Sequence, residues 1–494
     1  MRSLRCAVIG AGMAGILSVM KLRDAGIDDV TIYEKGEGFG GTWRENTYPG
    51  LSCDVPSHLY SYSSEPNPDW TRCFAPGAEI NAYFCDVARR HGLEPITRFG
   101  EEVTSCRFTD GRWHLETSTG ARDEVDVILA ATGVLHHPNI PDIEGLDSFG
   151  GRAFHSARWD HDVEIDRRRV GVVGTGSTAV QIAGAVVDRA SSFTLFQRTA
   201  QWIMPQDNPF YSDEERAGFR KDPELMAQVR RDWSKIFTEG FADALVNADS
   251  PEMKVLEDLC RKNLENHVTD PVLREKLRPN YRAACKRLVI SDNFYDAMQR
   301  PNAHLATEGI VRIVPKGVLT DDGQVHELDV LVLATGFKVD RFVRPTKVVG
   351  EGGIDLDEVW ADGPLAYLSI GVPGFPNFFM LNGPNGPVGN FSLIDVAELQ
   401  IAYILELLSR IRDDGATQVA PSAAATERFE ASRREAAKTT IWMTGCKSWY
   451  LDRHGIPATW PWGFTRFREV MVAPDWADFE LHSPRGARPA GTPH

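Results

Sequence analysis

Residues 6–15 read Cys6-Ala-Val-Ile-Gly10-Ala-Gly12-Met-Ala-Gly15, an apolar run that ends in three spaced glycines. The run predicts a buried strand, and periodic apolar residues from Met13 to about Ala25 predict a helix after the glycine turn. A strand from Val30 to Tyr33, ending at Glu34, completes a β-α-β unit. Such glycines allow a tight turn and bring backbone amides and a helix N-terminus close to a pyrophosphate. We therefore expect a dinucleotide site formed by Gly10, Gly12, Ala14 and Gly15, with Glu34 on the ribose hydroxyls.

The same pattern occurs a second time, where a strand at Val170–Val173 leads into Gly174-Thr175-Gly176-Ser177-Thr178. The next strand, at 193–196, ends at Gln197-Arg198-Thr199, so an arginine stands near the place of the acid. An arginine can pair with a 2′-phosphate through two parallel hydrogen bonds, whereas an acid would repel it. The first site should thus take a dinucleotide without this phosphate and the second should take NADP. The alternative for Arg198 is a solvated charge at a strand end.

Two further apolar strands end in Ala-Thr-Gly, at 131–133 and at 334–336. A strand of this kind fits a crossing between two nucleotide domains. The alternative is simply a buried strand that a glycine turn closes.

Composition narrows the class of protein. The chain has 494 residues, enough for two or three domains, and its net charge of −15 argues against nucleic acid and gives no support to an anionic membrane surface. No apolar run reaches transmembrane length, and the N-terminal apolar stretch runs directly into a glycine turn, which favours a strand over a signal peptide. The eight cysteines are scattered without a C-x-x-C pair. This pattern suits reduced thiols in a cytoplasmic protein and indicates neither a metal site nor a disulfide framework.

The predicted fold is α/β, with two Rossmann-like dinucleotide-binding domains and a helical insertion. We expect a discontinuous first domain at 1–145 and 338–494, a second domain at 150–210 and 284–335, and the insertion at 211–283, where charged helical patterns gather. The tail from about Pro484 is rich in Pro, Gly, Arg and Ala, which predicts disorder.

Two longer patterns carry a resemblance to a known family. The pattern F-x-G-x-x-x-H-x-x-x-W-P/D is matched between the two nucleotide units by Phe149, Gly151, His155, Trp159 and Asp160. The pattern G-G-x-W-x-x-x-x-Y-P-G-x-x-x-D is matched by Gly40, Gly41, Trp43, Tyr48, Pro49, Gly50 and Asp54. With these matches the sequence resembles the class B flavoprotein monooxygenases, and within them the Baeyer–Villiger monooxygenases, because related N-hydroxylating and flavin-containing enzymes usually lack the tryptophan at Trp159.

The resemblance implies FAD in the first site and NADPH in the second. It implies that dioxygen forms a flavin peroxide that inserts oxygen next to the carbonyl of a small-molecule ketone, giving an ester or lactone. The same peroxide, when protonated, oxidises sulfides or amines, which is the first alternative. A flavin reductase serving a partner protein, and an NADPH-binding protein without catalysis, are alternatives from other classes.

By resemblance, Arg287 in Cys285-Lys286-Arg287-Leu288 is the central catalytic residue and Asp54 holds it. The chemistry agrees, because guanidinium offers a peroxide anion a fixed positive charge without giving up a proton. Lys286 would join Arg198 and Thr199 on the 2′-phosphate, with a solvated lysine as the alternative. Further contacts to FAD are expected from Thr42, Trp43, Tyr60, Val103 and Leu393, although core packing is the usual role of a single aromatic.

The remaining expectations concern two connecting segments. His155 in the linker pattern should hydrogen-bond the backbone and couple domain rotation to cofactor handling, unless it is a structural link alone. Ser448-Trp449-Tyr450 resembles the family's mobile loop, with Trp449 on the nicotinamide side of NADP. The family's N-I-P-G-K stretch appears here only as His454-Gly455-Ile456-Pro457-Ala458, which leaves closure of this loop open.

Overall fold

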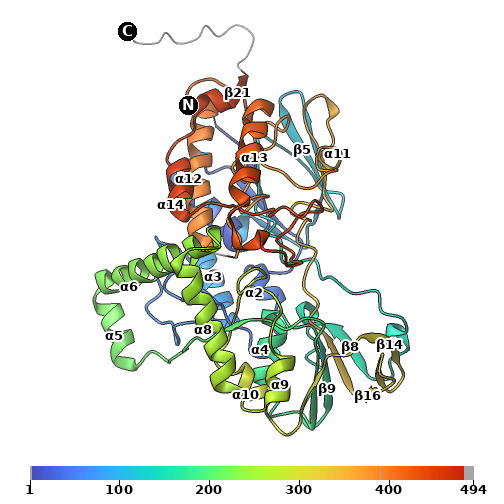
Figure 1. The fold of residues 1–494 in the computed structure, drawn as a ribbon. Coiled ribbons are helices and arrows are strands. Elements are labelled where there is room, and N and C mark those ends of the chain that lie inside the picture. Colours follow the sequence, from blue (N-terminus) through green and yellow to red (C-terminus); the bar gives the residue numbers. More distant parts are fainter. Residues whose placement is uncertain (1–2, 390, 483–494) are drawn as a thin grey trace.

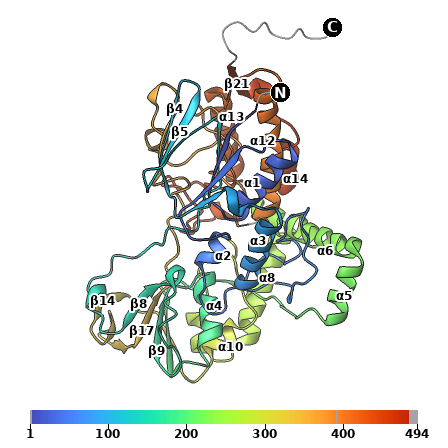
Figure 2. The same ribbon diagram turned by 180° about the vertical axis from the view of Figure 1, so that it is seen from behind.

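The computed structural model describes residues 3–389 and 391–482, so the tail predicted from about Pro484 lies outside the described residues. Two α/β bodies lie one above the other, and a group of helices projects from their side (Figures 1 and 2). The first described residues and the last described strand both lie at the far end of the upper body.

The upper body is built on a parallel sheet with the strand order β19-β7-β1-β2-β3. These strands are β1 (Cys6–Ile9), β2 (Val30–Glu34), β3 (Thr97–Phe99), β7 (Val127–Ala130) and β19 (Phe378–Met380). Helices α1 (Met13–Asp24), α3 (Gly77–Arg90) and α12 (Leu393–Arg412) supply the core on one face. A second sheet covers the other face, with β18 (Lys347–Val349), β4 (Val103–Thr109), β5 (Arg112–Thr117) and β6 (Arg122–Val125). Both faces of β1 are thus buried, which explains its unbroken apolar sequence.

The lower body repeats this plan with the strand order β13-β10-β9-β17-β8. Its strands are β8 (Arg152–His155), β9 (Arg169–Val173), β10 (Ser192–Phe196), β13 (Ala303–Ala306) and β17 (Val330–Leu333). Helices α4 (Ser177–Val186) and α10 (Phe294–Met298) pack on one face. The other face packs against the small sheet of β14 (Ile310–Val314), β15 (Gly317–Thr320) and β16 (Val325–Glu327). The predicted α/β class with two Rossmann-like units is confirmed, and the linker pattern contributes an edge strand of the second sheet.

Each Ala-Thr-Gly segment passes directly behind a glycine turn. Gly10 has φ +105°, and a Cβ on it would lie 2.6 Å from the carbonyl oxygen of Ala131. Gly174 has φ +122°, and a Cβ on it would lie 2.3 Å from the carbonyl oxygen of Ala334. Only glycine fits either turn, because both the left-handed backbone and the missing space exclude a side chain.

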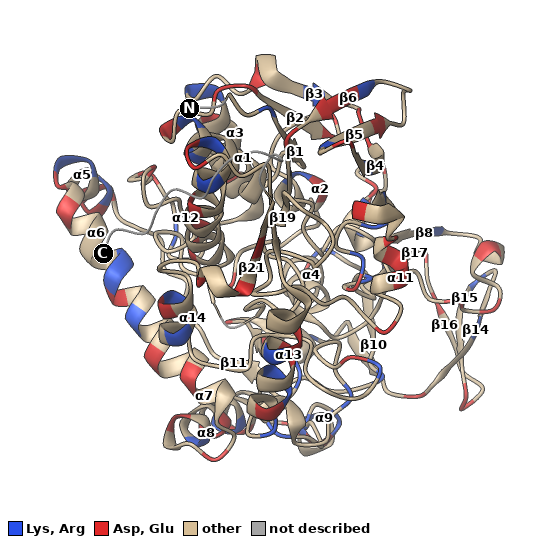
Figure 3. Ribbon diagram, turned by 90° about the horizontal axis from the view of Figure 1, so that it is seen from above, with Lys and Arg blue, Asp and Glu red and all other residues tan. Residues whose placement is uncertain are grey.

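The predicted helical insertion is also confirmed. It contains α5 (Asp213–Lys221), α6 (Pro223–Lys235), a π-helix (Ile236–Ala242), α7 (Asp243–Val246), α8 (Pro251–His267) and α9 (Pro271–Lys276). Its two ends are joined by a short parallel pair, β11 (Ile203–Met204) with β12 (Val289–Ile290). Lys and Arg are mixed with Asp and Glu along α5, α6 and α8, as expected of a helical surface that faces water (Figure 3).

The other α-helices and strands are α2 (Thr42–Glu45), α11 (Leu356–Val359), α13 (Ala423–Ala437), α14 (Phe464–Val470), β20 (Gln418–Pro421) and β21 (Phe479–His482). Short 3-10 helices lie at Glu94–Ile96, Leu146–Ser148, Ser156–Arg158, Glu351–Gly353, Ile441–Met443 and Trp476–Asp478. Among the described residues, none of the helices combines the length and the apolar character that crossing a membrane requires.

The expectation that the scattered cysteines are reduced thiols is wrong for two of the eight. Cys285 and Cys446 form a disulfide across 161 residues of sequence, with their Cα atoms 6.1 Å apart, while the other six cysteines are free. Spacing along the chain could not reveal this pair, because the fold alone brings the two segments together.

Candidate functional site

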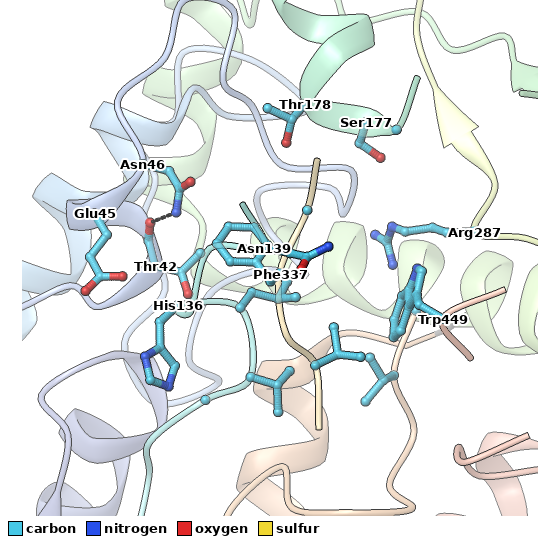
Figure 4. A pocket seen from close by; sticks show the side chains of 18 of the residues that line it. Thr42, Glu45, Asn46, His136, Asn139, Ser177, Thr178, Arg287, Phe337 and Trp449 are labelled. Atoms are coloured by element: carbon cyan, nitrogen blue, oxygen red, sulfur yellow. Dashed lines mark hydrogen bonds between the residues drawn. The ribbon is translucent and has the colours of Figure 1, made fainter. Parts of the chain in front are cut away.

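A cavity of about 1180 Å³ lies where the two bodies meet. It is lined by both glycine turns, by α2, and by the segments that carry Arg287 and Trp449. Figure 4 shows Thr42 of α2, Ser177 and Thr178 after the second turn, and Arg287 and Trp449 around this space. The predicted site residues that line it are Gly10, Gly12, Ala14, Glu34, Thr42, Trp43, Asp54, Tyr60, Val103, Leu393, Gly174, Thr175, Gly176, Ser177, Thr178, Arg198, Thr199, Lys286, Arg287 and Trp449. Gly15 and the five linker residues do not line it.

The first glycine turn has the features of an anion site. Helix α1 begins after Gly12 without a side-chain cap, so its first N–H groups are free for a ligand. The Glu34 carboxylate accepts hydrogen bonds from the backbone N–H of Ala11 (2.8 Å) and of Gly36 (2.7 Å), which fixes it beside the turn. Gly15 has a packing role, since a Cβ there would lie 1.9 Å from the Gly10 carbonyl oxygen.

Two further observations fit a bound dinucleotide at this end of the cavity. The Oδ1 atom of Asn382 is buried at the cavity and has no hydrogen-bonding partner within the described chain. A ligand donor would satisfy this acceptor, whose burial is otherwise costly. Trp43 donates from Nε1 to the Tyr60 hydroxyl (3.1 Å), with the rings edge to face at 5.6 Å. These two aromatics therefore pack against each other and border the cavity at once.

The second glycine turn repeats the arrangement. Helix α4 begins after Gly176, again without a side-chain cap, and Ser177 and Thr178 point toward the cavity (Figure 4). The Thr175 hydroxyl donates to the carbonyl oxygen of Thr199 (2.8 Å), which ties the turn to the segment after β10. The same segment carries Arg198.

Arg198 and Lys286 form a pair of neighbouring cations at the cavity. Burial, together with the positive charge of Arg198, lowers the pKa of Lys286. The Lys286 ammonium lies 4.9 Å from the centre of the Tyr281 ring, and within the described residues neither cation forms an ion pair with a carboxylate. Two adjacent cations that repel each other indicate a place prepared for an anion.

Arg287 and Asp54 form an ion pair that joins the two bodies across 233 residues of sequence. Asp54 raises the pKa of Arg287, against the opposing effect of burial, so the guanidinium is permanently charged. The exposed 32% of the Arg287 side chain faces the cavity, and Figure 4 shows its guanidinium pointing inward near Trp449. A fixed cation that faces a cavity is suited to stabilising negative charge on a substrate.

Of the five linker residues, His155 contacts the second Ala-Thr-Gly segment, and none of the five lines the cavity. The backbone N–H of Ala157 donates to His155 Nδ1 (3.1 Å), so His155 Nε2 carries the proton and donates to the Gly336 carbonyl oxygen (3.0 Å). A Cβ on Gly151 would lie 2.2 Å from the carbonyl oxygen of Asp329, which requires glycine there. Asp160 pairs with Arg152, Trp159 meets Phe154 edge to face, and Phe149 packs on the core under β14 and β15.

Sequence reasoning missed several residues of the site. Phe237 and Phe241 reach the cavity from the π-helix of the insertion. Gln181 of α4 accepts a hydrogen bond from Tyr48 (2.9 Å) and donates to the Ser52 carbonyl oxygen (3.0 Å), linking the bodies at the cavity wall. None of these three belongs to a motif. Gly50 of the second motif was a sequence signal for a close backbone approach at this place. The structure shows that the approaching backbone is that of Gln181, because a Cβ on Gly50 would lie 2.5 Å from the Gln181 carbonyl oxygen.

Comparison with known proteins places the chain in a family. Residues 3–345 match the family model described as flavin-binding monooxygenase-like. The chain is 47% identical to an uncharacterized monooxygenase of Mycobacterium tuberculosis (strain ATCC 25618 / H37Rv), covering 99% of this chain and 98% of that one. It is 38% identical to a Baeyer–Villiger monooxygenase of Streptomyces coelicolor, covering 98% and 94%. The crystal structure of an OTEMO complex with FAD and NADP superposes with a TM-score of 0.86 at 29% identity, covering 97% and 99%.

The fold and these matches define a flavoprotein monooxygenase, and the chain belongs to the flavin-binding monooxygenase-like family. The predicted Baeyer–Villiger type is confirmed as well, because a relative that bears this name aligns with nearly the whole chain.

Proposed function

We propose that this protein uses NADPH, FAD and dioxygen to convert a ketone into an ester or lactone. The observation that carries the proposal is the Arg287–Asp54 pair, which faces a cavity that both glycine turns also line. The Streptomyces coelicolor relative and the OTEMO complex with FAD and NADP support the reaction type and the two cofactors.

Each end of the cavity would hold one nucleotide. The first glycine turn and Glu34 bind FAD, while the second turn binds NADP, whose 2′-phosphate lies on Arg198, Lys286 and Thr199. The chemistry that FAD supplies when bound is the acceptance of hydride and the activation of dioxygen. The FAD-binding domain would then comprise 1–145 and 338–494, and the NADP-binding domain 150–210 and 284–335. The helical insertion at 211–283 would lie between the two parts of the NADP-binding domain.

Arg287 would act by charge alone. Its guanidinium stabilises negative charge that develops on oxygen during the attack on the ketone carbonyl, and it keeps its own protons because of its high pKa. Asp54 holds the guanidinium at the cavity, and Trp449 borders the nicotinamide side. A cytoplasmic location stays a prediction.

The experiment combines substrate specificity with one matched pair of variants. The FAD-loaded protein is given NADPH with ketones and, separately, with sulfides, and ester, lactone and sulfoxide are quantified. We expect ester or lactone from the wild type, and in Arg287→Ala we expect flavin reduction by NADPH to persist while ester formation is lost. Arg282→Ala is the control, because Arg282 lies five residues away and pairs with Glu257 instead of facing the cavity. Sulfoxide without any ester in the wild type would overturn the proposal, as would an unchanged ester yield in Arg287→Ala.

A further inference from the structure

The loop that carries Trp449 is covalently attached to the segment that carries Arg287. The Cys285–Cys446 disulfide starts two residues before Arg287 and ends three residues before Trp449. Trp449 lines the cavity and is 41% exposed. Tyr450, the next residue, turns inward and is only 4% exposed.

Tyr450 lies beside Arg287, which itself lines the cavity. Its hydroxyl is close enough to the guanidinium for a side-chain hydrogen bond, with the guanidinium N–H as donor. Both groups lie against Gly389, because a Cβ there would be 2.0 Å from the Tyr450 hydroxyl and 3.1 Å from Arg287 Nη1. Burial raises the pKa of Tyr450 despite the nearby positive charge, so the group is a neutral phenol. Arg287 is thus held from one side by Asp54 and from another by Tyr450.

The surroundings leave little room for Tyr450 to move while the disulfide is intact. Its ring lies 5.5 Å from Trp442 and 4.1 Å from Trp449, and its carbonyl oxygen accepts a hydrogen bond from the N–H of Ala458 (2.7 Å). Both half-cystines belong to the same buried apolar cluster as Tyr450 and Trp442. Ala284, directly before Cys285, has φ +64°, a left-handed conformation that a non-glycine residue keeps only where its surroundings impose it.

We propose that Tyr450 is a positioning residue for Arg287, and that the Cys285–Cys446 disulfide is a latch that holds the loop and Tyr450 in place. The disulfide would restrict the movement of the loop that carries Trp449, in a chain that lacks most of the N-I-P-G-K stretch after this residue. The proposal rests on the proposed function only for the role of Arg287.

Opening the latch is a thiol–disulfide exchange. Cys446 is the more accessible half, at 8% exposure, while Cys285 is fully buried. A dithiol attacks the Cys446 sulfur and releases the Cys285 thiol, and its second thiol then frees Cys446. The protein disulfide is reduced to two thiols, and the dithiol is oxidised to its own disulfide. A small-molecule disulfide reverses the exchange.

The first measurements need no turnover. In denaturant without reductant we expect six reactive thiols per chain, and eight after treatment with a dithiol. We expect Cys446→Ser, Cys285→Ser and dithiol-treated wild type to be cleaved faster by protease within 439–459 and to bind NADP⁺ more weakly. Cys260→Ser is the matched control, because Cys260 is buried in the same apolar cluster but free. The dithiol-treated wild type keeps the test decisive if Cys285→Ser does not fold.

The second measurement is the amount of ester formed per NADPH consumed. We expect Tyr450→Phe to lower this ratio by about tenfold, the size of losing one hydrogen bond to a charged group. Tyr367→Phe should leave it unchanged, since Tyr367 is also a buried, hydrogen-bonded tyrosine, but its hydroxyl donates to Asp478 and does not meet Arg287. In an Arg287→Lys background Tyr450→Phe should have a much smaller effect, because Tyr450 acts through the guanidinium.

Eight reactive thiols before reduction would overturn the latch, and so would wild-type protease resistance in Cys446→Ser. An equal loss from Tyr450→Phe in both backgrounds would overturn the positioning role. If the wild type forms no ester at all, the ratio of hydrogen peroxide formed to NADPH consumed replaces the ester ratio. The failure of the proposed function is then visible separately from the thiol count and the protease pattern.

Discussion

Replacing Arg198 by alanine should separate NADPH from NADH. The Arg198 side chain follows β10 at the edge of the cavity and lies near Lys286, whose pKa it helps to lower. Only NADPH carries a 2′-phosphate, so the loss of Arg198 removes a charge-assisted contact from NADPH and nothing comparable from NADH.

The size of the effect follows from the exposure of the site. A hydrogen bond to a charged group contributes about 1.5–3 kcal/mol. Arg198 is exposed to solvent, so screening places the loss at the lower end, about 1.5 kcal/mol, which corresponds to about a tenfold weaker affinity. We expect Lys286→Ala to show a smaller loss, because its ammonium forms only a point contact and also lies over the Tyr281 ring.

The assay is anaerobic flavin reduction at several concentrations of NADPH and of NADH, which yields an apparent Kd and a hydride-transfer rate for each. Arg189→Ala is the matched control, because Arg189 belongs to the same body, pairs with Asp166 and does not line the cavity. Equal losses of affinity for NADPH and NADH in Arg198→Ala would refute the assignment of this residue to the 2′-phosphate.

Three other expected outcomes follow from the same geometry. In Gly174→Ala the new Cβ would meet the Ala334 carbonyl oxygen. We therefore expect weaker NADP⁺ binding by calorimetry and a free energy of unfolding in urea that is lower by about 2 kcal/mol. Unchanged binding would contradict this. Asp54→Asn should lower ester yield per NADPH while hydride transfer persists, because the guanidinium of Arg287 loses its charged partner; a full yield would count against the pair. Burial lowers the pKa of His58 from 6.5 to about 4. The free energy of unfolding is therefore highest above pH 6.5 and falls by up to about 3 kcal/mol toward pH 4, because the unfolded chain takes up the proton first. His58→Phe should remove this part of the pH dependence in urea titrations at pH 7 and pH 5, and the same slope in both proteins would contradict it.

The nucleotide units were predictable because their signals are local. The apolar residues of β1, the glycines after it and Glu34 at the end of β2 all lie within 30 residues, and each position is set by a turn or a strand end. The insertion was visible for a similar reason, since its charged helical periodicity differs from the buried strands on either side.

The remaining parts of the site depend on distant pairing, which a single sequence does not encode in any readable pattern. Cys446 meets Cys285 only because the C-terminal loop returns to the lower body, and the same return places Tyr450 on Arg287. The β8 strand was read as linker because its sequence, Arg-Ala-Phe-His, lies at the sheet edge and is largely exposed rather than apolar on both faces. Its parallel pairing with β17 in the structure identifies it as a strand, which the periodicity of the sequence did not indicate.

The placement of Arg287 constrains how the two bodies can move. The cation follows the insertion and precedes β12, whereas its partner Asp54 belongs to a loop of the upper body. A relative rotation of the bodies that preserves this ion pair must therefore pivot close to it. Tyr48, Gly50 and Ser52, from the same loop as Asp54, contact Gln181 of α4, so the pivot would include the wall of the cavity itself. A site built in this way can admit and release a nucleotide at its outer edge while the charge at its centre stays in place.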